Sequence, residues 1–297
     1  MKKFLSIVIA ALMVAALAAC GSAPASSAPA SSGVSSSDAS SAPASSEASS
    51  ESSSSEAAGE VVTSQEGKLV VGTSADFAPY EFHILKDGKD QIVGFDMALA
   101  QAIADDLGLE LVIKDMSFDS ILIELSSGTI DLGIAGFSPD PERAESVDFS
   151  DYYYMGGQSL MIRKADADKY TSFESLKGLP VGAQTGSIQE DLAKEHTPES
   201  SLVSLTAIPN VIMELKAGKI EAAFMETVVA EGYLATQDDL MIAMEVPYDV
   251  EGSAVAIKKG NDAMTAAVNA TIKKVLENGD MDKFIQEANA LAEEAIS

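Results

Sequence analysis

The stretch that decides the fold is "ELSSGTIDLGIAG" at residues 124–136, because the chain repeats it as "ELKAGKIEAAFME" at residues 214–226. Each copy reads as the end of a helix, a glycine that stops it, and a buried strand. Two similar α/β lobes would each contain this unit once, although helix–turn–strand units are common enough for a chance likeness. The residues in register are Glu124/Glu214, Leu125/Leu215, Gly128/Gly218 and Ile130/Ile220.

The composition bounds the protein class. The chain has 297 residues with 46% apolar content, which is enough for two domains. Its 46 acidic and 19 basic side chains give a net charge of −27. Such a polyanion repels DNA and RNA; the charge is either a soluble surface or a field that attracts cationic solutes. With one cysteine and two distant histidines, His83 and His196, we expect no disulfide, metal or cofactor.

The first twenty residues, "MKKFLSIVIAALMVAALAAC", have the pattern of a secretory signal peptide at 1–19. Two lysines precede an apolar run at 4–19 that is shorter than the roughly 20 residues of a membrane span. The end of the run resembles a bacterial lipobox, which implies cleavage before Cys20 and a lipid on its sulfur. An ordinary signal peptide is the alternative. Two or three acyl chains would anchor the protein stably.

Residues 20–60 are dominated by Ser, Ala and Pro and contain almost no large apolar side chains. Such a segment cannot bury enough surface to offset its ordering entropy. We predict a disordered tether with a reach of roughly 35 Å as a flexible coil. Function is therefore expected outside the membrane and close to it.

From residue 68 onward, strands alternate with helices. The helix predicted at 94–108 places an apolar side chain at every fourth position and ends at Gly108: Phe95, Leu99, Ile103 and Leu107. The series restarts at "GLPVGAQTGS", residues 178–187, where Ser187 and Glu190 have the spacing of a capping box for a helix at 188–196. The pattern predicts two lobes, each with a mostly parallel sheet flanked by helices.

Ligands bind beyond the carboxyl ends of parallel strands, and both repeat copies reach such an end. There Gly136 offers a bare backbone N–H, which suits an anion, and Glu226 offers a carboxylate, which suits a cation. A small ligand that carries both charges is an α-amino acid.

Six segments in order resemble the family 3 extracellular solute-binding proteins, the amino-acid receptors of ABC importers. They are "LVVGTSADFAPYEF", "GFDMALAQAIADDLG", "IDLGIAGFSPDPERAESVDFSDYYY", "GLPVGAQTGSIQE", "AAFMETVVAEGYL" and "VLENGDMDKF". The resemblance implies a two-lobed α/β fold of the periplasmic-binding-protein type II, with two hinge crossovers. Lobe one would comprise 61–156 plus 250–297, and lobe two would comprise 157–249.

The resemblance also implies a ligand site. Arg143 matches an arginine that grips the ligand carboxylate, a task that suits the planar guanidinium. Glu226 matches an acid, usually Asp in the family, that holds the α-ammonium, so its extra methylene sets this chain apart. The remaining matches are backbone or hydroxyl donors, two aromatic rings that sandwich the ligand side chain, and positions that tune specificity: Gly136, Ser138, Ser187, Ile188, Phe77, Phe118, Ser74 and Gln184.

Ser74 stands where several binders of cationic amino acids have Asp. This difference weakens the hypothesis that the ligand is lysine or arginine. Asp76, Glu81 and Asp119 lie nearby and could substitute. Each of the site residues also has a structural alternative, as a surface charge, a core ring or a helix cap.

We therefore expect a monomeric extracellular lipoprotein that captures a polar or cationic L-amino acid and delivers it to ABC permease subunits. It would be lipid-anchored to the outer face of the cytoplasmic membrane. A dehydratase-like enzyme on the same fold, or a sensor or adhesin, remains the alternative. No Gly-x-Ser-x-Gly, phosphate-loop or His-Glu-x-x-His motif favours an enzyme.

Overall fold

The computed structural model describes residues 60–249 and 252–296, which belong to one compact unit. The predicted signal peptide, Cys20 and nearly all of the tether lie outside the described residues. Within the described part, no helix is long and apolar enough to cross a membrane.

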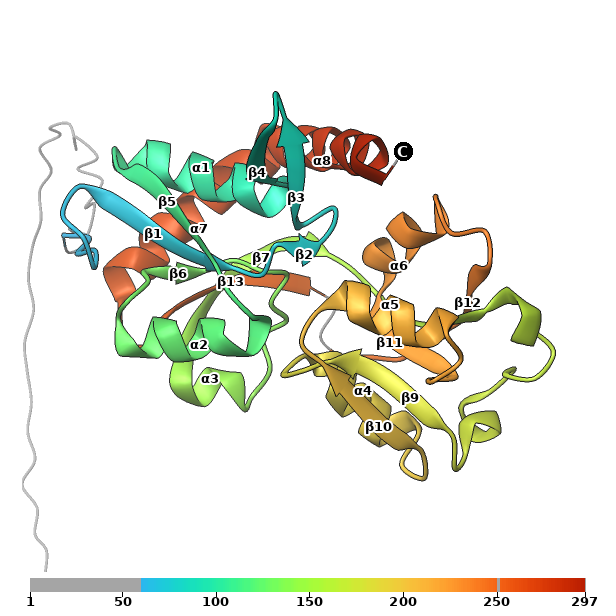
Figure 1. Cartoon of the computed structure of the whole chain (residues 1–297). Helices are drawn as coiled ribbons and strands as arrows, with labels where there is room; N and C mark the ends of the chain where they lie inside the picture. Colours follow the sequence, from blue (N-terminus) through green and yellow to red (C-terminus); the bar gives the residue numbers. More distant parts are fainter. Residues whose placement is uncertain (1–59, 250–251, 297) are drawn as a thin grey trace, which may run out of the picture. The chain divides into compact units, whose positions relative to one another are not determined.

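The first lobe is built on a mixed sheet with the strand order β5-β1-β6-β13-β7 (Figure 1). β1 pairs in parallel with β5 and β6, whereas β13 is antiparallel to both of its neighbours. The sheet is therefore mostly parallel with one reversed strand. Its strands are β1 (Lys68–Thr73), β5 (Glu110–Asp115), β6 (Leu132–Gly133), β7 (Val147–Met155) and β13 (Gly252–Lys258).

The second lobe repeats this order in the sheet β10-β9-β11-β8-β12. Here β9 pairs in parallel with β10 and β11, and β8 is the reversed strand. In each lobe the reversed strand is thus the fourth in the order. The strands are β8 (Gln158–Arg163), β9 (Pro180–Gln184), β10 (Ser201–Leu205), β11 (Ala222–Glu226) and β12 (Leu240–Val246).

The helices pack their apolar stripes against these sheets. In α1 the predicted stripe is buried: Phe95, Leu99 and Ile103 have no exposed surface, and Gly108 ends the helix in a left-handed conformation. The helices of the first lobe are α1 (Phe95–Leu107), α2 (Phe118–Ser127), α3 (Arg143–Ser146), α7 (Asp262–Glu277) and α8 (Asp280–Ile296). Those of the second are η1 (Lys164–Asp166), η2 (Phe173–Leu176), α4 (Ile188–His196), α5 (Ile208–Lys216) and α6 (Thr227–Leu234).

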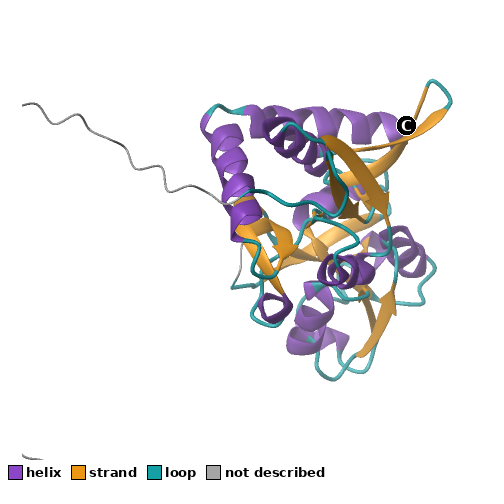
Figure 2. Cartoon of the chain, turned by 90° about the vertical axis from the view of Figure 1, so that its left-hand side faces the viewer, coloured by secondary structure: helices purple, strands orange, loops and turns teal. Residues whose placement is uncertain are grey.

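A small antiparallel sheet follows β1 and was not predicted from the sequence. It consists of β2 (Asp76–Phe77), β3 (Glu81–Lys86) and β4 (Lys89–Val93), and β3 packs against α8 (Figure 1, Figure 2). This sheet matters for function, because β2, the turn after it and the start of β3 carry four side chains of the pocket described below: Asp76, Phe77, Tyr80 and Glu81.

The chain passes between the lobes where β7 gives way to β8, at Gly156 and Gly157, and again between β12 and β13. A Cβ atom at Gly156 would clash with the Glu226 carboxylate. The first crossover therefore lies directly against the pocket. Residues 250 and 251 of the second crossover lie outside the described residues.

The repeated pattern occupies the same place in both lobes. The first copy is the end of α2 followed by β6, which pairs with β1; the second is the end of α5 followed by β11, which pairs with β9. Gly128 and Gly218 follow the two helices with φ of 80° and 69°, a conformation that glycine adopts without strain.

Candidate functional site

A single pocket between the lobes contains every ligand-binding residue expected from the sequence. It includes about 510 Å³ of space between atoms, counting the part open to solvent. The ten expected residues that line it are Ser74, Phe77, Phe118, Gly136, Ser138, Arg143, Gln184, Ser187, Ile188 and Glu226. Asp119 is not part of the lining; it is exposed on α2, where it approaches Gly186.

Arg143 is the guanidinium of this pocket, and its side chain is 11% exposed. It donates to the Ser138 carbonyl at 2.8 Å and to the Gly186 carbonyl at 3.0 Å, and Nε lies 3.1 Å from the Asp140 carboxylate. Burial lowers its pKa, and the Asp140 charge opposes that shift. A guanidinium has five N–H donors, so capacity for a bound anion remains on its terminal nitrogens.

Local structure explains why Arg143 points inward. Asp140 accepts the Arg143 backbone N–H at 2.9 Å, which fixes the start of the short helix α3. The guanidinium carbon lies 5.7 Å from the centre of the Phe118 ring and 5.6 Å from that of Phe137, and these two rings stack at 4.7 Å. The rings hold the cation over their faces.

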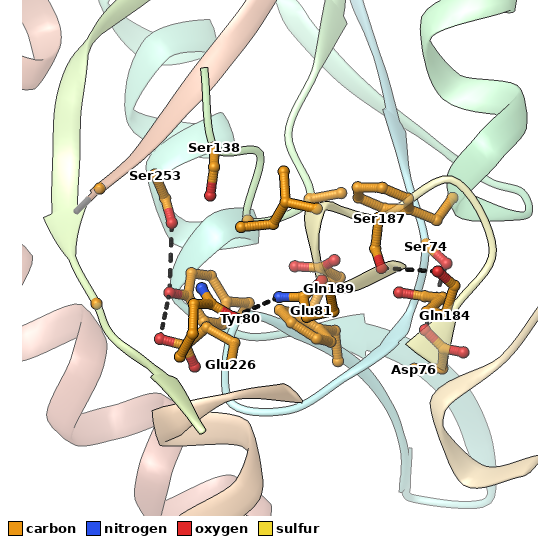
Figure 3. Close-up of a pocket in the computed structure, with 18 of the residues that line it drawn as sticks. Ser74, Asp76, Tyr80, Glu81, Ser138, Gln184, Ser187, Gln189, Glu226 and Ser253 are labelled. Carbon is orange, nitrogen blue, oxygen red and sulfur yellow. Dashed lines mark hydrogen bonds between the residues drawn. The ribbon is translucent and has the colours of Figure 1, made fainter. Parts of the chain in front are cut away.

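Glu226 supplies a carboxylate from the second lobe. It ends β11, is 5% exposed, and caps α6 by accepting the Val229 N–H at 3.1 Å. The Tyr80 hydroxyl donates to its other oxygen at 3.3 Å. Burial raises the pKa of Glu226 to about 7, while the helix N–H groups act in the opposite direction. Glu226 is therefore both a helix cap and the acid at one end of the pocket (Figure 3).

Three aromatic side chains contribute to the lining. Phe77 and Phe118 are 8% and 9% exposed, so both are largely buried while lining the pocket. Tyr80, which was not predicted as a site residue, packs 5.3 Å from Phe77 and 4.3 Å from Phe95, centre to centre. Its hydroxyl is also 3.3 Å from Ser253 Oγ. Tyr80 thus contacts both the Phe77 ring of the first lobe and the Glu226 carboxylate of the second.

Two acids without close cationic partners lie on the first lobe. Glu81 is fully buried and lines the pocket; its carboxyl group interacts with the Asp96 carboxyl, and no other described side chain bonds to either of its oxygens. Burial raises its pKa well above the ordinary value, and the charge of Asp96 raises it further. Asp96 accepts hydrogen bonds from Tyr153 at 2.9 Å and from the Gly136 N–H at 3.0 Å, and burial raises its pKa to about 6.

The Gly136 contact changes one expectation. Its N–H was expected to face a ligand carboxylate, but in this structure it donates to Asp96. Gly136 has φ of 58°, and a Cβ atom there would lie 3.1 Å from the Phe77 ring. The residue therefore lines the pocket by letting the backbone approach a ring, while its amide holds a buried acid.

The expected capping box at α4 is wrong in detail. Ser187 does not cap the helix; its hydroxyl donates to the Gln184 carbonyl at 2.7 Å. Glu190 accepts the N–H of Gly186 at 2.9 Å and not that of Ser187. The turn Gln184–Ser187 is thereby closed on itself, and Ile188 begins α4 at the pocket wall with its side chain 6% exposed.

Four further polar side chains of the lining were missed as site residues from the sequence, beside the lining residues Ala135, Gly156 and Gly252. Gln189 donates to Gln158 at 2.7 Å, which joins the first turn of α4 to the start of β8. The others are Tyr80 and Ser253. Tyr80 lies within the quoted segment "LVVGTSADFAPYEF" and could have been marked from there, whereas the Gln158–Gln189 pair depends on the packing of two elements and has no local signal.

The chemistry of the lining favours a zwitterion. Among the described lining residues there are three carboxyl groups, Asp76, Glu81 and Glu226, and one guanidinium, Arg143. In Figure 3, Glu226, Tyr80 and Ser253 lie at one end, and Ser74, Asp76 and Gln184 lie at the other. The described residues include no cluster of three or more potential metal ligands. The arrangement can hold an anion and a cation side by side, with a further cation within reach of the remaining acids.

Comparisons with known proteins agree with this geometry. The model of the family "Bacterial extracellular solute-binding proteins, family 3" matches residues 69–288. The arginine-binding extracellular protein ArtP of Bacillus subtilis (strain 168) is 38% identical over 225 residues, which are 74% of this chain and 86% of that protein.

Solved structures are similar as well. The amino acid ABC transporter substrate-binding protein AbpA from Streptococcus pneumoniae, bound to L-arginine, matches with 43% identity and a TM-score of 0.74 over 76% of this chain and 96% of that chain. The ancestral amino-acid-binding protein AncCDT-1, a precursor of cyclohexadienyl dehydratase, matches with 33% identity and a TM-score of 0.68 over 74% and 95%.

The expected two-lobed α/β architecture of the periplasmic-binding-protein type II is thus confirmed by the two sheets and by these structural neighbours. Because the family model spans most of the chain, the protein belongs to the family 3 bacterial extracellular solute-binding proteins.

Proposed function

We propose that this protein captures a cationic L-amino acid, with arginine as the best fit, and presents it to the permease of an ABC importer. The observation that carries the proposal is the placement of Arg143 and Glu226, from different lobes, in the lining of one buried pocket. Arg143 pairs with the ligand carboxylate, Glu226 pairs with the α-ammonium, and the rings of Phe77 and Phe118 hold the aliphatic stem.

A cationic ligand side chain is favoured by Glu81. A buried carboxyl group without a cationic partner is costly, and Glu81 lines the pocket facing another acid, Asp96. A ligand guanidinium or ammonium would satisfy it. The relatives named for arginine, ArtP and AbpA, are consistent with this choice. Glu81 thus takes over the task that we associated with an acid at position 74.

The test is calorimetric titration with L-arginine and with L-citrulline, which has the same shape without the charge. Glu81→Gln should weaken arginine binding by about 10- to 100-fold, as expected for a lost charge-assisted hydrogen bond. Citrulline binding should change by less than about threefold. An equal loss of affinity for both ligands would show that Glu81 does not recognise the charge of the ligand side chain.

Proton release gives an independent readout. Burial raises the pKa of Glu81 and so favours its protonated form before binding, whereas pairing with a cation favours the ionised carboxylate. Arginine should therefore release more protons than citrulline, measured in buffers of different ionisation enthalpy, and this difference should disappear in Glu81→Gln.

The cellular setting is also part of the proposal. We infer removal of the signal peptide 1–19, lipidation of Cys20 with a diacylglycerol and a palmitate-type acyl chain, and a monomer tethered at the outer surface of the cytoplasmic membrane. Support comes from the lipobox-like sequence and from the extracellular family. Cys20→Ser should release the protein from the membrane fraction, and mass spectrometry should find lipid on the N-terminal peptide of the unmodified chain only.

The enzymatic alternative is tested in the same titration. AncCDT-1 is a precursor of a dehydratase, and a buried acid such as Glu226 could donate a proton. We expect arginine to be recovered unchanged after prolonged incubation, as judged by chromatography. Conversion of any bound ligand would replace the transport proposal with catalysis.

A further inference from the structure

Asp76 lines the pocket, but its carboxylate is directed to the opposite lobe. It lies on β2 of the first lobe, and its Oδ2 accepts the backbone N–H of Ile208 in the second lobe at 2.9 Å. The other oxygen accepts from Ser74 Oγ at 3.3 Å. This contact distinguishes Asp76 from Glu81, whose carboxyl group interacts with Asp96 of its own lobe.

The second lobe needs this contact. Ile208 is the first residue of α5, and Ala207 stands at the N-cap, where it has no side chain that could accept a hydrogen bond. Pro209 has no N–H, and the N–H of Asn210 is taken by the Ala207 carbonyl at 3.1 Å. The Ile208 amide is therefore the one early donor of α5 that depends on a partner from outside the helix, and the first lobe supplies it.

The pseudo-equivalent loop of the second lobe reaches across in the opposite direction. Gly72 of β1 and Gly182 of β9 occupy matching places, because each packs against the isoleucine of the repeat, Ile130 or Ile220. Counting from these glycines, Gly186 corresponds to Asp76. Gly186 accepts from Arg143 in the first lobe at 3.0 Å. The two lobes thus clasp each other through equivalent loops, once through a carboxylate and once through a carbonyl.

We propose that Asp76 is a positioning residue, a latch that stabilises the arrangement in which the lobes meet around the ligand by capping α5 across the cleft. The inference rests on the proposed amino-acid binding in this pocket. A latch acts on closure and not on the ligand, so its loss weakens the binding of every ligand by the same factor.

The experiment compares Asp76→Ala, Asp76→Asn and, as a matched control, Asp119→Ala, which removes an exposed carboxylate at the same boundary. Titrations use L-arginine and L-citrulline. Asp76→Ala should weaken both by about five- to tenfold, the equivalent of a lost helix cap. Asp76→Asn keeps an acceptor oxygen and should stay within about twofold, as should the control.

Hydrogen exchange of the Ile208 amide in the unmodified protein provides the second measurement, so the proposal is tested even if Asp76→Ala does not fold. The amide should exchange more slowly with arginine bound than without it. Unchanged exchange overturns the latch, as does a loss confined to arginine, which would make Asp76 a ligand contact. Failure of the unmodified protein to bind either ligand overturns the proposed function itself, whereas binding that Asp76→Ala leaves intact overturns only the latch.

Discussion

The two lobes share a framework but contribute different chemistry. In each, a glycine of the second strand of the sheet, β1 or β9, faces an isoleucine of the repeat, so closely that a Cβ on Gly72 or Gly182 would come within 3.0 Å of Ile130 or Ile220. Beyond this contact the copies diverge. β6 ends at Gly133 and the chain continues to Gly136 and Arg143, whereas β11 continues to Glu226.

Because of this divergence, the two charged groups of the proposed site, Arg143 and Glu226, come from different lobes. The first lobe provides the guanidinium, the aromatic rings, Asp76 and Glu81, and the second provides Glu226 and the first turn of α4. In the proposed binding mode the ligand carboxylate faces Arg143 of the first lobe, and the α-ammonium faces Glu226 of the second. Full complementarity to an amino acid therefore exists only when the lobes meet, which links recognition to closure.

The largest effect on ligand affinity is expected at one of the two arginines of the chain. Each lobe contains one of them, so they can be compared directly. Arg143→Ala should weaken amino-acid binding by at least about 100-fold, because in the proposed binding mode it removes the buried charge that pairs with the ligand carboxylate. Arg163 is the matched control. It is paired within its own lobe to Asp166 at 2.7 Å and to Glu221. Arg163→Ala should lower the melting temperature and leave the dissociation constant within about threefold.

Titration calorimetry and thermal melting of both variants separate these roles. Equal loss of affinity in the two variants would mean that the asymmetry between the arginines is not functional. Arg143→Lys adds detail, since a point charge without the planar fork should recover only part of the affinity.

The next effect concerns Glu226 and pH. Its folded-state pKa of about 7 lies above the ordinary 4.5, so in the ligand-free protein its stabilising contribution is complete below about pH 4.5 and is lost as the pH rises through 7. Ligand binding has the opposite sign, because the ammonium needs the ionised carboxylate. Affinity should therefore fall as the pH drops below about 7, by at most about tenfold per unit.

Glu226→Gln separates the two signs in one protein. At pH 8 the ligand-free variant should be more stable than the unmodified protein, by up to about 2–3 kcal/mol, yet it should bind amino acids about 30-fold more weakly. Chemical denaturation and calorimetry at pH 5.5 and pH 8 measure both. A variant that is destabilised without ligand at pH 8 would contradict the burial of an unfavourable charge.

The sequence was sufficient for the features that depend on local pattern. The stripe of α1 with Gly108 behind it, the span of α4, and the equivalence of the two repeats all follow from spacing and from turn glycines. The resemblance to a family then indicated the pocket residues, and the structure brings all ten into one lining.

The features that were not predicted from the sequence depend on contacts between segments far apart in the chain. Tyr80 reaches Glu226, 146 positions away, and Asp76 reaches Ile208, 132 positions away. The commitment of the Gly136 amide to Asp96 likewise requires α1 to be packed in place. Such long-range partners leave no periodic signal, so local reasoning assigned Gly136 to the ligand and left Tyr80 unmarked.

The smallest expected effect tests the shared framework. Gly72→Ala and Gly182→Ala should each lower the free energy of unfolding by about 1–3 kcal/mol, because an added methyl overpacks a filled core. The nearest obstacle in both cases is the Cδ1 atom of an isoleucine, which valine lacks. Ile130→Val should therefore restore part of the stability of Gly72→Ala, and Ile220→Val that of Gly182→Ala, as measured by denaturant unfolding. Exchanging the rescue mutations between lobes provides the control: Ile220→Val must not rescue Gly72→Ala. If one lobe tolerates the alanine without the isoleucine-to-valine change, the two lobes share their backbone arrangement but differ in how side chains pack around the equivalent glycines.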